Sequence, residues 1–239
     1  DVQYSSRTIA YLSPTRIVWQ ETTGSSSIEG IDKLLLPGNG QAELVGGKEC
    51  VIRKRPDGKV SFLLEFGREL QGGIQIVTGQ SSRKEAKVRI RFGESVSEAM
   101  CDITPENGAT NDHAIRDFHF TLPWLGVAEI GNSGFRFVRI DVEEPDIDLL
   151  LKEVRATFGY RDIPYLGSFK SDNDRLNDIW MTGAYTVHLN MQEYIWDGVK
   201  RDRLVWIGDL HPELMTVNTV FGYNEVIPKS LDLIRDTTP

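Results

Sequence analysis

The sequence predicts a β-sandwich followed by α-helices, with the change near residue 165. Up to about residue 160, short runs such as "GIQIVTG" and "AKVRIRFG" recur between glycine-rich breaks, which is typical of an antiparallel, jelly-roll-like sandwich. After "RDIPYLGSFK" the apolar residues recur at helical spacing. A chain of 239 residues, 40% hydrophobic and 26% charged, allows one large domain or two smaller ones. The change of period favours two, residues 1–163 and 164–239.

The β-rich part divides into seven expected strands. A hairpin turn is predicted at "RPDG", because Asp57-Gly58 is a frequent hairpin pair. The segment from Gly93 to Arg116 is expected to be a long polar loop. The strands are expected in "CVIRK", "VSFLLEF", "GIQIVTG", "AKVRIRFG", "RDFHFTL", "GFRFVRIDV" and "LLLKEVRATFGY".

Three helices are expected after the sandwich. Ser171 is the predicted N-cap of the first helix, which runs to about residue 191 with Asp172 and Asp174 in its first turn. The second helix is predicted over 210–221, closed by Gly222, and the third over 228–235. One apolar stripe of the first helix is formed by Leu176, Ile179, Trp180, Val187 and Met191.

Charge and composition exclude several classes of function. A net charge of -8 with dispersed basic residues argues against nucleic acid or an anionic membrane as partner. No apolar run approaches the ~20 residues of a membrane span. Cys50 and Cys101 support neither a disulfide framework nor a metal site and are expected to be buried free thiols, unless they meet in space. The compartment stays open between export and the cytoplasm.

The segment "YIWDGVKRDRLVWIGDLHPE", residues 194–213, combines carboxylates with tryptophans. Charge alone would favour a salt-bridged linker, with Asp197 paired to Arg201. Two tryptophans in the same segment favour a sugar site instead, because aromatic faces stack on C–H patches while charged groups bond hydroxyls. Glycoside hydrolysis also needs one carboxyl group to protonate the leaving oxygen and another to activate water. His211 lies close enough in sequence to reach the same ligand.

The motif "DGVKRDRLVWIGD" resembles the signature of the bacterial α-L-rhamnosidases, inverting glycoside hydrolases with an α/α six-hairpin toroid. "LLEFGRELQGGIQI", "VRIRFGES", "FRFVRIDV" and "LGSFKSDNDRLNDIW" resemble the sandwich and entry helix that precede that toroid. The resemblance covers most of the chain. It implies that residues 1–163 are the N-terminal sandwich domain and that residues 164–239 are the incomplete start of the toroid.

The resemblance also implies roles for single residues. Asp202 matches the family's general acid, although many members carry Glu there, and Asp197 is the alternative acid. Asp197, Arg201, Trp206 and Asp209 match positions that hold the sugar or shape the surroundings of the acid. An acid that works near neutrality needs a raised pKa, so we expect Asp202 to be buried beside Asp197 and Asp209.

The family's general base is a Glu in a later part of the toroid, and no segment here matches it. Glu213 is the other acid considered for that role. It is disfavoured because "LHPE" reads as the start of the second helix, where the helix dipole favours a Glu.

The sequence thus predicts the front portion of a glycoside hydrolase that releases terminal α-L-rhamnose from glycosides or polysaccharides. No metal or cofactor is required, and the rest of the toroid is the expected partner. Without the base, residues 1–239 alone are expected to be inactive. Two alternatives remain: a non-catalytic carbohydrate-binding sandwich, and a six-hairpin glycosidase with another sugar specificity.

Overall fold

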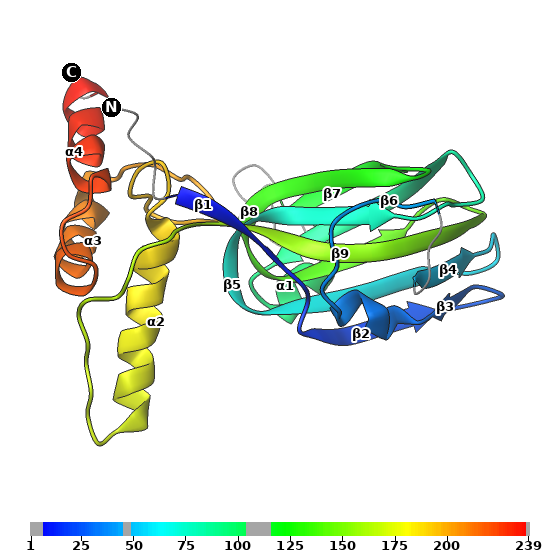
Figure 1. Ribbon diagram of the computed structural model, residues 1–239, viewed down its shortest axis with the longest axis horizontal. Helices are drawn as coiled ribbons and strands as arrows, with labels where there is room; N and C mark the ends of the chain where they lie inside the picture. The colour runs from blue at the N-terminus through cyan, green and yellow to red at the C-terminus, as the bar shows by residue number, and fades with distance from the viewer. Residues whose placement is uncertain (1–6, 45–48, 104–115, 238–239) are drawn as a thin grey trace. The chain divides into compact units, whose positions relative to one another are not determined.

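The computed structural model describes residues 7–44, 49–103 and 116–237 and divides the chain into two compact units (Figure 1). The sandwich unit is Ala10–Phe158. The helical unit holds the described residues of Asp1–Ile9 and Gly159–Pro239. The predicted fold class, antiparallel β-structure followed by helices, is confirmed. The domain limits 1–163 and 164–239 stay a prediction.

Within the described residues, nine strands form the β-structure, in the order β3-β4-β9-β5-β8-β6-β7, with β1 paired to β9 and β2 to β5. The pairs whose register is defined are antiparallel. A 3-10 helix, Ile31–Leu35, follows β3. The strands are β1 Arg7–Leu12, β2 Arg16–Thr22, β3 Ser27–Glu29, β4 Cys50–Lys54, β5 Val60–Thr78, β6 Glu85–Gly93, β7 Asp117–Pro123, β8 Gly126–Val142 and β9 Ile147–Arg161.

Strand β5 is the centre of the sandwich. Its residues from Val60 to Phe66 are all buried, and because successive side chains point to opposite faces, both faces of the strand must be covered. Register shifts against β8 between Glu65 and Leu70 let the strand bend. Its first part pairs with β2 and its last part with β9. The core between the layers includes Phe92 and Phe135, whose rings meet edge to face at 4.9 Å.

Two predictions for the β-rich part are wrong. The turn at "RPDG" forms, with the Gly58 amide donating to the Arg55 carbonyl at 3.1 Å, but β4 and β5 do not pair because β9 lies between them. The segment from Gly93 to Arg116 is not all loop, since α1 spans Val96–Met100, capped by the Ser95 side chain. Residues 104–115 of that segment lie outside the described residues.

The predicted free thiols are found, with one difference. Cys50 is buried in β4, and burial raises the pKa of its thiol to about 12. Cys101 is free but only half-buried. Among the described residues, no helix is long and apolar enough to cross a membrane.

The helical unit contains α2 (Asp174–Asn190), α3 (Ile207–Val220) and α4 (Val226–Thr237). Ser171 is not the N-cap of α2. The cap is Asn173, whose side-chain oxygen accepts from the Arg175 amide at 3.0 Å. The Ser171 amide donates instead to the Asn177 side chain at 2.8 Å, which braces the segment before the helix. The second and third predicted helices are confirmed, with earlier starts.

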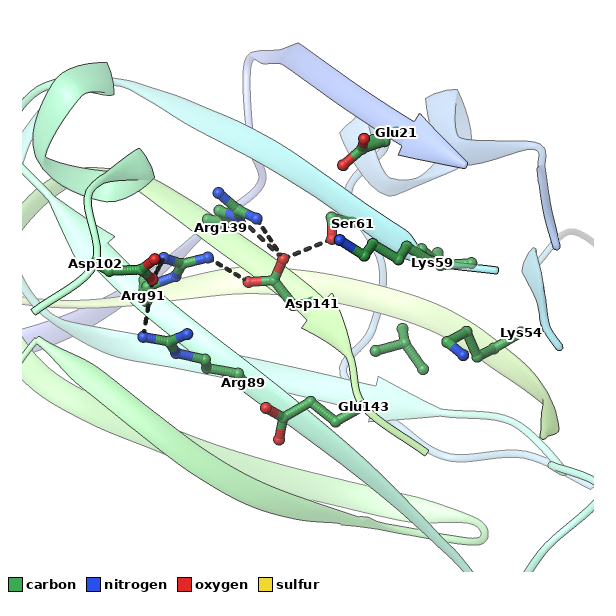
Figure 2. Close-up of a pocket in the computed structure, with 12 residues that line it drawn as sticks. Glu21, Lys54, Lys59, Ser61, Arg89, Arg91, Asp102, Arg139, Asp141 and Glu143 are labelled. Carbon is green, nitrogen blue, oxygen red and sulfur yellow. Dashed lines mark hydrogen bonds and ion pairs between the residues drawn. The ribbon is translucent and has the colours of Figure 1, made fainter. Parts of the chain in front are cut away.

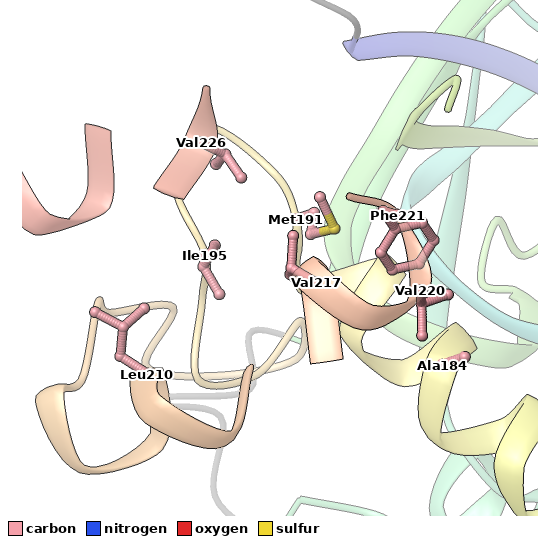
Figure 3. Close-up of a cluster of buried hydrophobic side chains, with 8 residues drawn as sticks. All are labelled: Ala184, Met191, Ile195, Leu210, Val217, Val220, Phe221 and Val226. Carbon is pink, nitrogen blue, oxygen red and sulfur yellow. The ribbon is translucent and has the colours of Figure 1, made fainter. Parts of the chain in front are cut away.

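A buried cluster joins the three helices to the segment between α2 and α3 (Figure 3). Trp180 and Val187 of the predicted stripe pack against this cluster, and Met191 is part of it. Leu176 and Ile179, nearer the start of α2, are 47% and 57% exposed. The stripe is therefore confirmed only toward the end of α2. The cluster consists of Ala184, Met191, Ile195, Leu210, Val217, Val220, Phe221 and Val226.

Candidate active site

The segment between α2 and α3 contains a closed loop that begins at Asp197 and ends at Leu204. The Asp197 amide donates to the Leu204 carbonyl at 2.9 Å, and the Leu204 amide donates to Asp197 Oδ1 at 2.8 Å. Asp197 thus uses both its backbone and its carboxylate to hold the neck of the loop. The alternative of a salt-bridged linker paired Asp197 with Arg201, but in the structure Asp197 accepts the Leu204 amide instead, and Arg201 is exposed. We call these two hydrogen bonds the clamp.

Asp202 lies in this loop in an unusual backbone conformation. Its φ is 59°, and that of the next residue, Arg203, is 56°. The left-handed region costs an L-residue other than glycine ~1–2 kcal/mol, and such strain persists only where the surrounding structure enforces it. Asp202 is also exposed, so the predicted burial of this carboxyl is wrong. The loop therefore holds Asp202 in a left-handed backbone conformation at an exposed position.

Arg203 stabilises the loop from inside. Its Nε donates to the Val199 carbonyl at 3.0 Å, and its guanidinium lies over the ring of Trp196, 5.5 Å from the centroid. Burial lowers the pKa of Arg203 because a desolvated cation is disfavoured. Arg203 and the half-buried Trp196 therefore act as supports of the loop.

Trp206 stands at the start of α3 with its side chain 57% exposed. It is the N-cap residue, and its carbonyl accepts from the amides of Asp209 and Leu210 at 3.1 and 2.9 Å. The helix begins at Ile207 rather than near 210, so Pro212 lies inside it. Asp209 is in the first turn, and both Asp209 and His211 are exposed. A flat indole at the head of a helix, with polar groups nearby, is suited to stacking on a sugar ring.

Glu213 is the carboxyl group of this region that is buried. It is 9% exposed and accepts a 3.3 Å hydrogen bond from Asn190 Nδ2 at the end of α2. Burial raises its pKa to about 7, the Asn190 bond opposes this shift, and the charges of Asp209 and Asp197 add to it. The sequence prediction placed Glu213 in the first turn of α3, but the helix starts six residues before it. The sequence does contain one relevant signal, the spacing of four residues between Asp209 and Glu213, which puts the two side chains on the same face of a helix.

The structure thus places Glu213 where the charges of Asp209 and Asp197 both act on it. Asp202 and Arg201 lie on the loop closed by Asp197, and Trp206 and His211 lie on the first turns of α3. The predicted site residues therefore share one loop and the adjoining end of one helix.

The sandwich unit has a separate polar cavity of about 300 Å³, which the sequence did not predict (Figure 2). Asp141 of β8 accepts from Ser61 Oγ at 2.5 Å, Arg91 at 2.8 Å and Arg139 at 2.8 Å. Burial raises the pKa of Asp141, but these hydrogen bonds outweigh burial and lower it. Because its charged groups pair with one another between β6 and β8, we interpret this cavity as a stabilising ion-pair network.

Part of the helical unit matches the model of a known protein family. Residues 164–238 match the model of the bacterial alpha-L-rhamnosidase 6 hairpin glycosidase domain. The match contains the whole of the loop, α3 and α4. The comparison with curated protein sequences finds no match.

Solved rhamnosidases share this fold. A rhamnosidase from Klebsiella oxytoca with rhamnose bound is 17% identical, with a TM-score of 0.70 over 96% of this chain and 44% of that protein. A GH78 family rhamnosidase of Bacillus sp. GL1 is 21% identical, with a TM-score of 0.68 over 87% of this chain and 20% of that protein. A Streptomyces avermitilis alpha-L-rhamnosidase complexed with L-rhamnose is 20% identical, with a TM-score of 0.55 over 75% of this chain and 17% of that protein.

The resemblance predicted from the sequence is therefore confirmed, and the chain spans less than half the length of these relatives. At these identities the structural matches establish the fold.

Proposed function

We propose that this chain is part of a glycoside hydrolase that releases terminal α-L-rhamnose by an inverting acid/base mechanism, with Asp202 as the general acid. The observation that carries the proposal is the conformation of Asp202, held at φ 59° on a loop that Asp197 closes. Strain of this kind is retained where it has a use. The same loop lies within the part of the chain that matches the six-hairpin family.

Each exposed residue of the site has a role in this proposal. The indole of Trp206 stacks on the apolar C–H face of the rhamnose ring. Arg201, Asp209 and His211 hydrogen-bond its hydroxyl groups.

The chemical step then transfers one proton and breaks one bond. Asp202 donates its proton to the glycosidic oxygen as the bond to the anomeric carbon breaks. A water molecule, deprotonated by a second carboxylate, attacks the opposite face of that carbon and inverts its configuration. We place this second carboxylate outside residues 1–239, at the ~6.5–9.5 Å from the acid that leaves room for the water.

The test is Asp202→Asn in the full-length protein. Asn removes the proton to be donated, keeps the shape and tolerates the left-handed backbone. We expect kcat on a natural rhamnoside to fall ~10²–10⁴-fold, the usual contribution of general acid catalysis, with L-rhamnose binding retained. An aryl rhamnoside with a good leaving group should show a smaller loss because it needs less protonation.

The matched control is Asp178→Asn, which changes an exposed carboxylate of α2 in the same unit and should leave kcat unchanged. Near-normal turnover of a natural rhamnoside by Asp202→Asn would reject the assignment. If Asp197→Asn then abolished turnover with binding intact, Asp197 would be the acid.

A further inference from the structure

Glu213 is a buried carboxyl group that is linked to the neck of the loop through Asn190, whose carbonyl accepts the amide of Trp196, the residue before Asp197, at 2.9 Å. Asp209 and Glu213 lie one turn apart on α3, and the charges of Asp209 and Asp197 both act on Glu213. Glu213 is 9% exposed, and its hydrogen bond comes from the neutral Asn190 at 3.3 Å. Among the described residues, no cation forms an ion pair with Glu213. A buried carboxylate without a cation is costly, and two nearby like charges add to that cost.

The clamp, in contrast, is stronger when the carboxyl group of Asp197 carries its negative charge. Its Oδ1 accepts the Leu204 amide at 2.8 Å, and an ionised carboxylate is the stronger acceptor for an amide. Asp197 therefore works best with its charge, whereas Glu213 is most stable without one. A single proton held on Glu213 satisfies both groups. If that proton is lost, a third negative charge appears beside Asp197 and Asp209.

We propose that Glu213 is a positioning residue of the candidate active site, and that its protonated carboxyl group allows the ionised Asp197 to clamp the loop that carries Asp202. This inference rests on the proposed function of that loop. Ionisation of Glu213 places three like charges around the neck of the loop, and their repulsion weakens the clamp. The left-handed backbone of Asp202 and Arg203 is then no longer enforced, and the acid moves away from the glycosidic oxygen.

The position of Glu213 argues against a direct role as the general base. A base must reach the attacking water, and a side chain that is 9% exposed and faces Asn190 is withdrawn from solvent. Its influence passes through Asp197 instead. Its pKa of about 7 places the change of charge where the pH dependence of activity can be measured.

The first experiment compares kcat/KM for a natural rhamnoside between pH 5 and 9 in the full-length protein and in Glu213→Gln. Gln mimics the protonated carboxyl group and cannot ionise. We expect the wild type to lose activity as the pH rises through about 7. The variant should match it within about threefold at pH 5.5 and keep its activity at least one pH unit further into the alkaline range. Asp178→Asn, the exposed control, should follow the wild-type profile.

Asn190→Ala gives a second and independent perturbation. The Asn190 hydrogen bond lowers the pKa of Glu213, so its removal should move the alkaline limb to higher pH. A purely structural role for either residue would reduce activity equally at all pH values and leave the limb in place. That result would overturn the proposal. A loss of 10²-fold or more in folded Glu213→Gln across the whole range would also overturn it, because it would make Glu213 a catalytic group.

A measurement without substrate separates this inference from the proposed function. Trp196 and Trp206 flank the clamp, so their fluorescence should report its state. We expect a transition near pH 7 in the wild type that is absent from Glu213→Gln. If the protein hydrolyses no rhamnoside but shows this transition, the proposed function fails and the coupling of Glu213 to the loop stands. A wild type without the transition refutes the coupling itself.

Discussion

The buried carboxyl of Glu213 should make the stability of the protein depend on pH, and Glu213→Gln should remove that dependence. Burial and neighbouring charges raise its pKa from 4.5 to about 7. Below pH 4.5 the folded and unfolded states both hold the proton, so the shift contributes nothing. As the pH rises, the unfolded state releases the proton while the folded state keeps it, so the free energy of unfolding falls until about pH 7.

The size of this effect follows from the shift. One pKa unit corresponds to ~1.4 kcal/mol, so the full shift from 4.5 to about 7 destabilises the wild type by at most ~3.5 kcal/mol well above pH 7. Glu213→Gln should therefore equal the wild type in stability at pH 4.5 and exceed it by up to ~3 kcal/mol at pH 8. A gain of ~1 kcal/mol would still be a readable shift of the urea midpoint, because urea slopes are ~1–3 kcal/mol per molar.

Urea unfolding of the full-length protein, followed by tryptophan fluorescence at pH 4.5, 6, 7 and 8, measures the difference. Asp178→Asn should show no growing difference from the wild type over this range, because the side chain is exposed. Two results would refute the reasoning: a Glu213→Gln difference that is constant with pH, or a variant that is less stable than the wild type at pH 8. Either would mean that Glu213 is ionised and stabilised by a partner.

Two further predictions concern the sandwich network and the isolated chain. Asp141→Asn should cost about 3 kcal/mol at pH 7, because it removes a carboxylate that pairs with both Arg91 and Arg139 and leaves the buried Arg91 with Asp102 alone. The pKa of Asp141 is lowered in the folded state. Its contribution to the free energy of unfolding is therefore present above the unfolded-state pKa of 3.8 and is lost as the pH falls through the folded-state pKa. Urea unfolding should show that Asp141→Asn is less stable than the wild type at pH 7 and that the difference is smaller at pH 3. Purified residues 1–239 should not hydrolyse an aryl α-L-rhamnoside, and a soluble monomer turning over at ~1–10³ per second would contradict this.

The sequence by itself determined the order of strands and helices along the chain, because local residue patterns indicate each of them. Strand alternation and helical spacing are properties of neighbouring residues, so the sandwich, the three helices and the motif between the first two could be predicted. The buried end of the α2 stripe, at Val187 and Met191, followed the same rule. The exposed start at Leu176 did not, because burial depends on what packs against a face.

Pairing between strands is not a local property. The turn at "RPDG" has the chemistry of a hairpin, yet β9, some 90 residues later in the chain, separates the two strands it joins. The sequence around Asp57 and Gly58 contains no information about a strand so far away. Turn chemistry therefore predicted a turn and could not predict its partners.

The chemical state of the candidate site was decided by packing. The sequence prediction assigned burial to Asp202 and the start of the second helix to Glu213, whereas in the structure Asp202 is exposed and Glu213 is buried six residues into α3. Pro212 made the start of α3 look later than it is, since proline is most often found in the first turn of a helix. With the helix starting at Ile207, Glu213 turns inward toward Asn190 of α2. Residue types and spacing identified which carboxyl groups gather here, but the contact between two helices determines which one is buried, because desolvation depends on the surrounding atoms rather than on the neighbouring sequence.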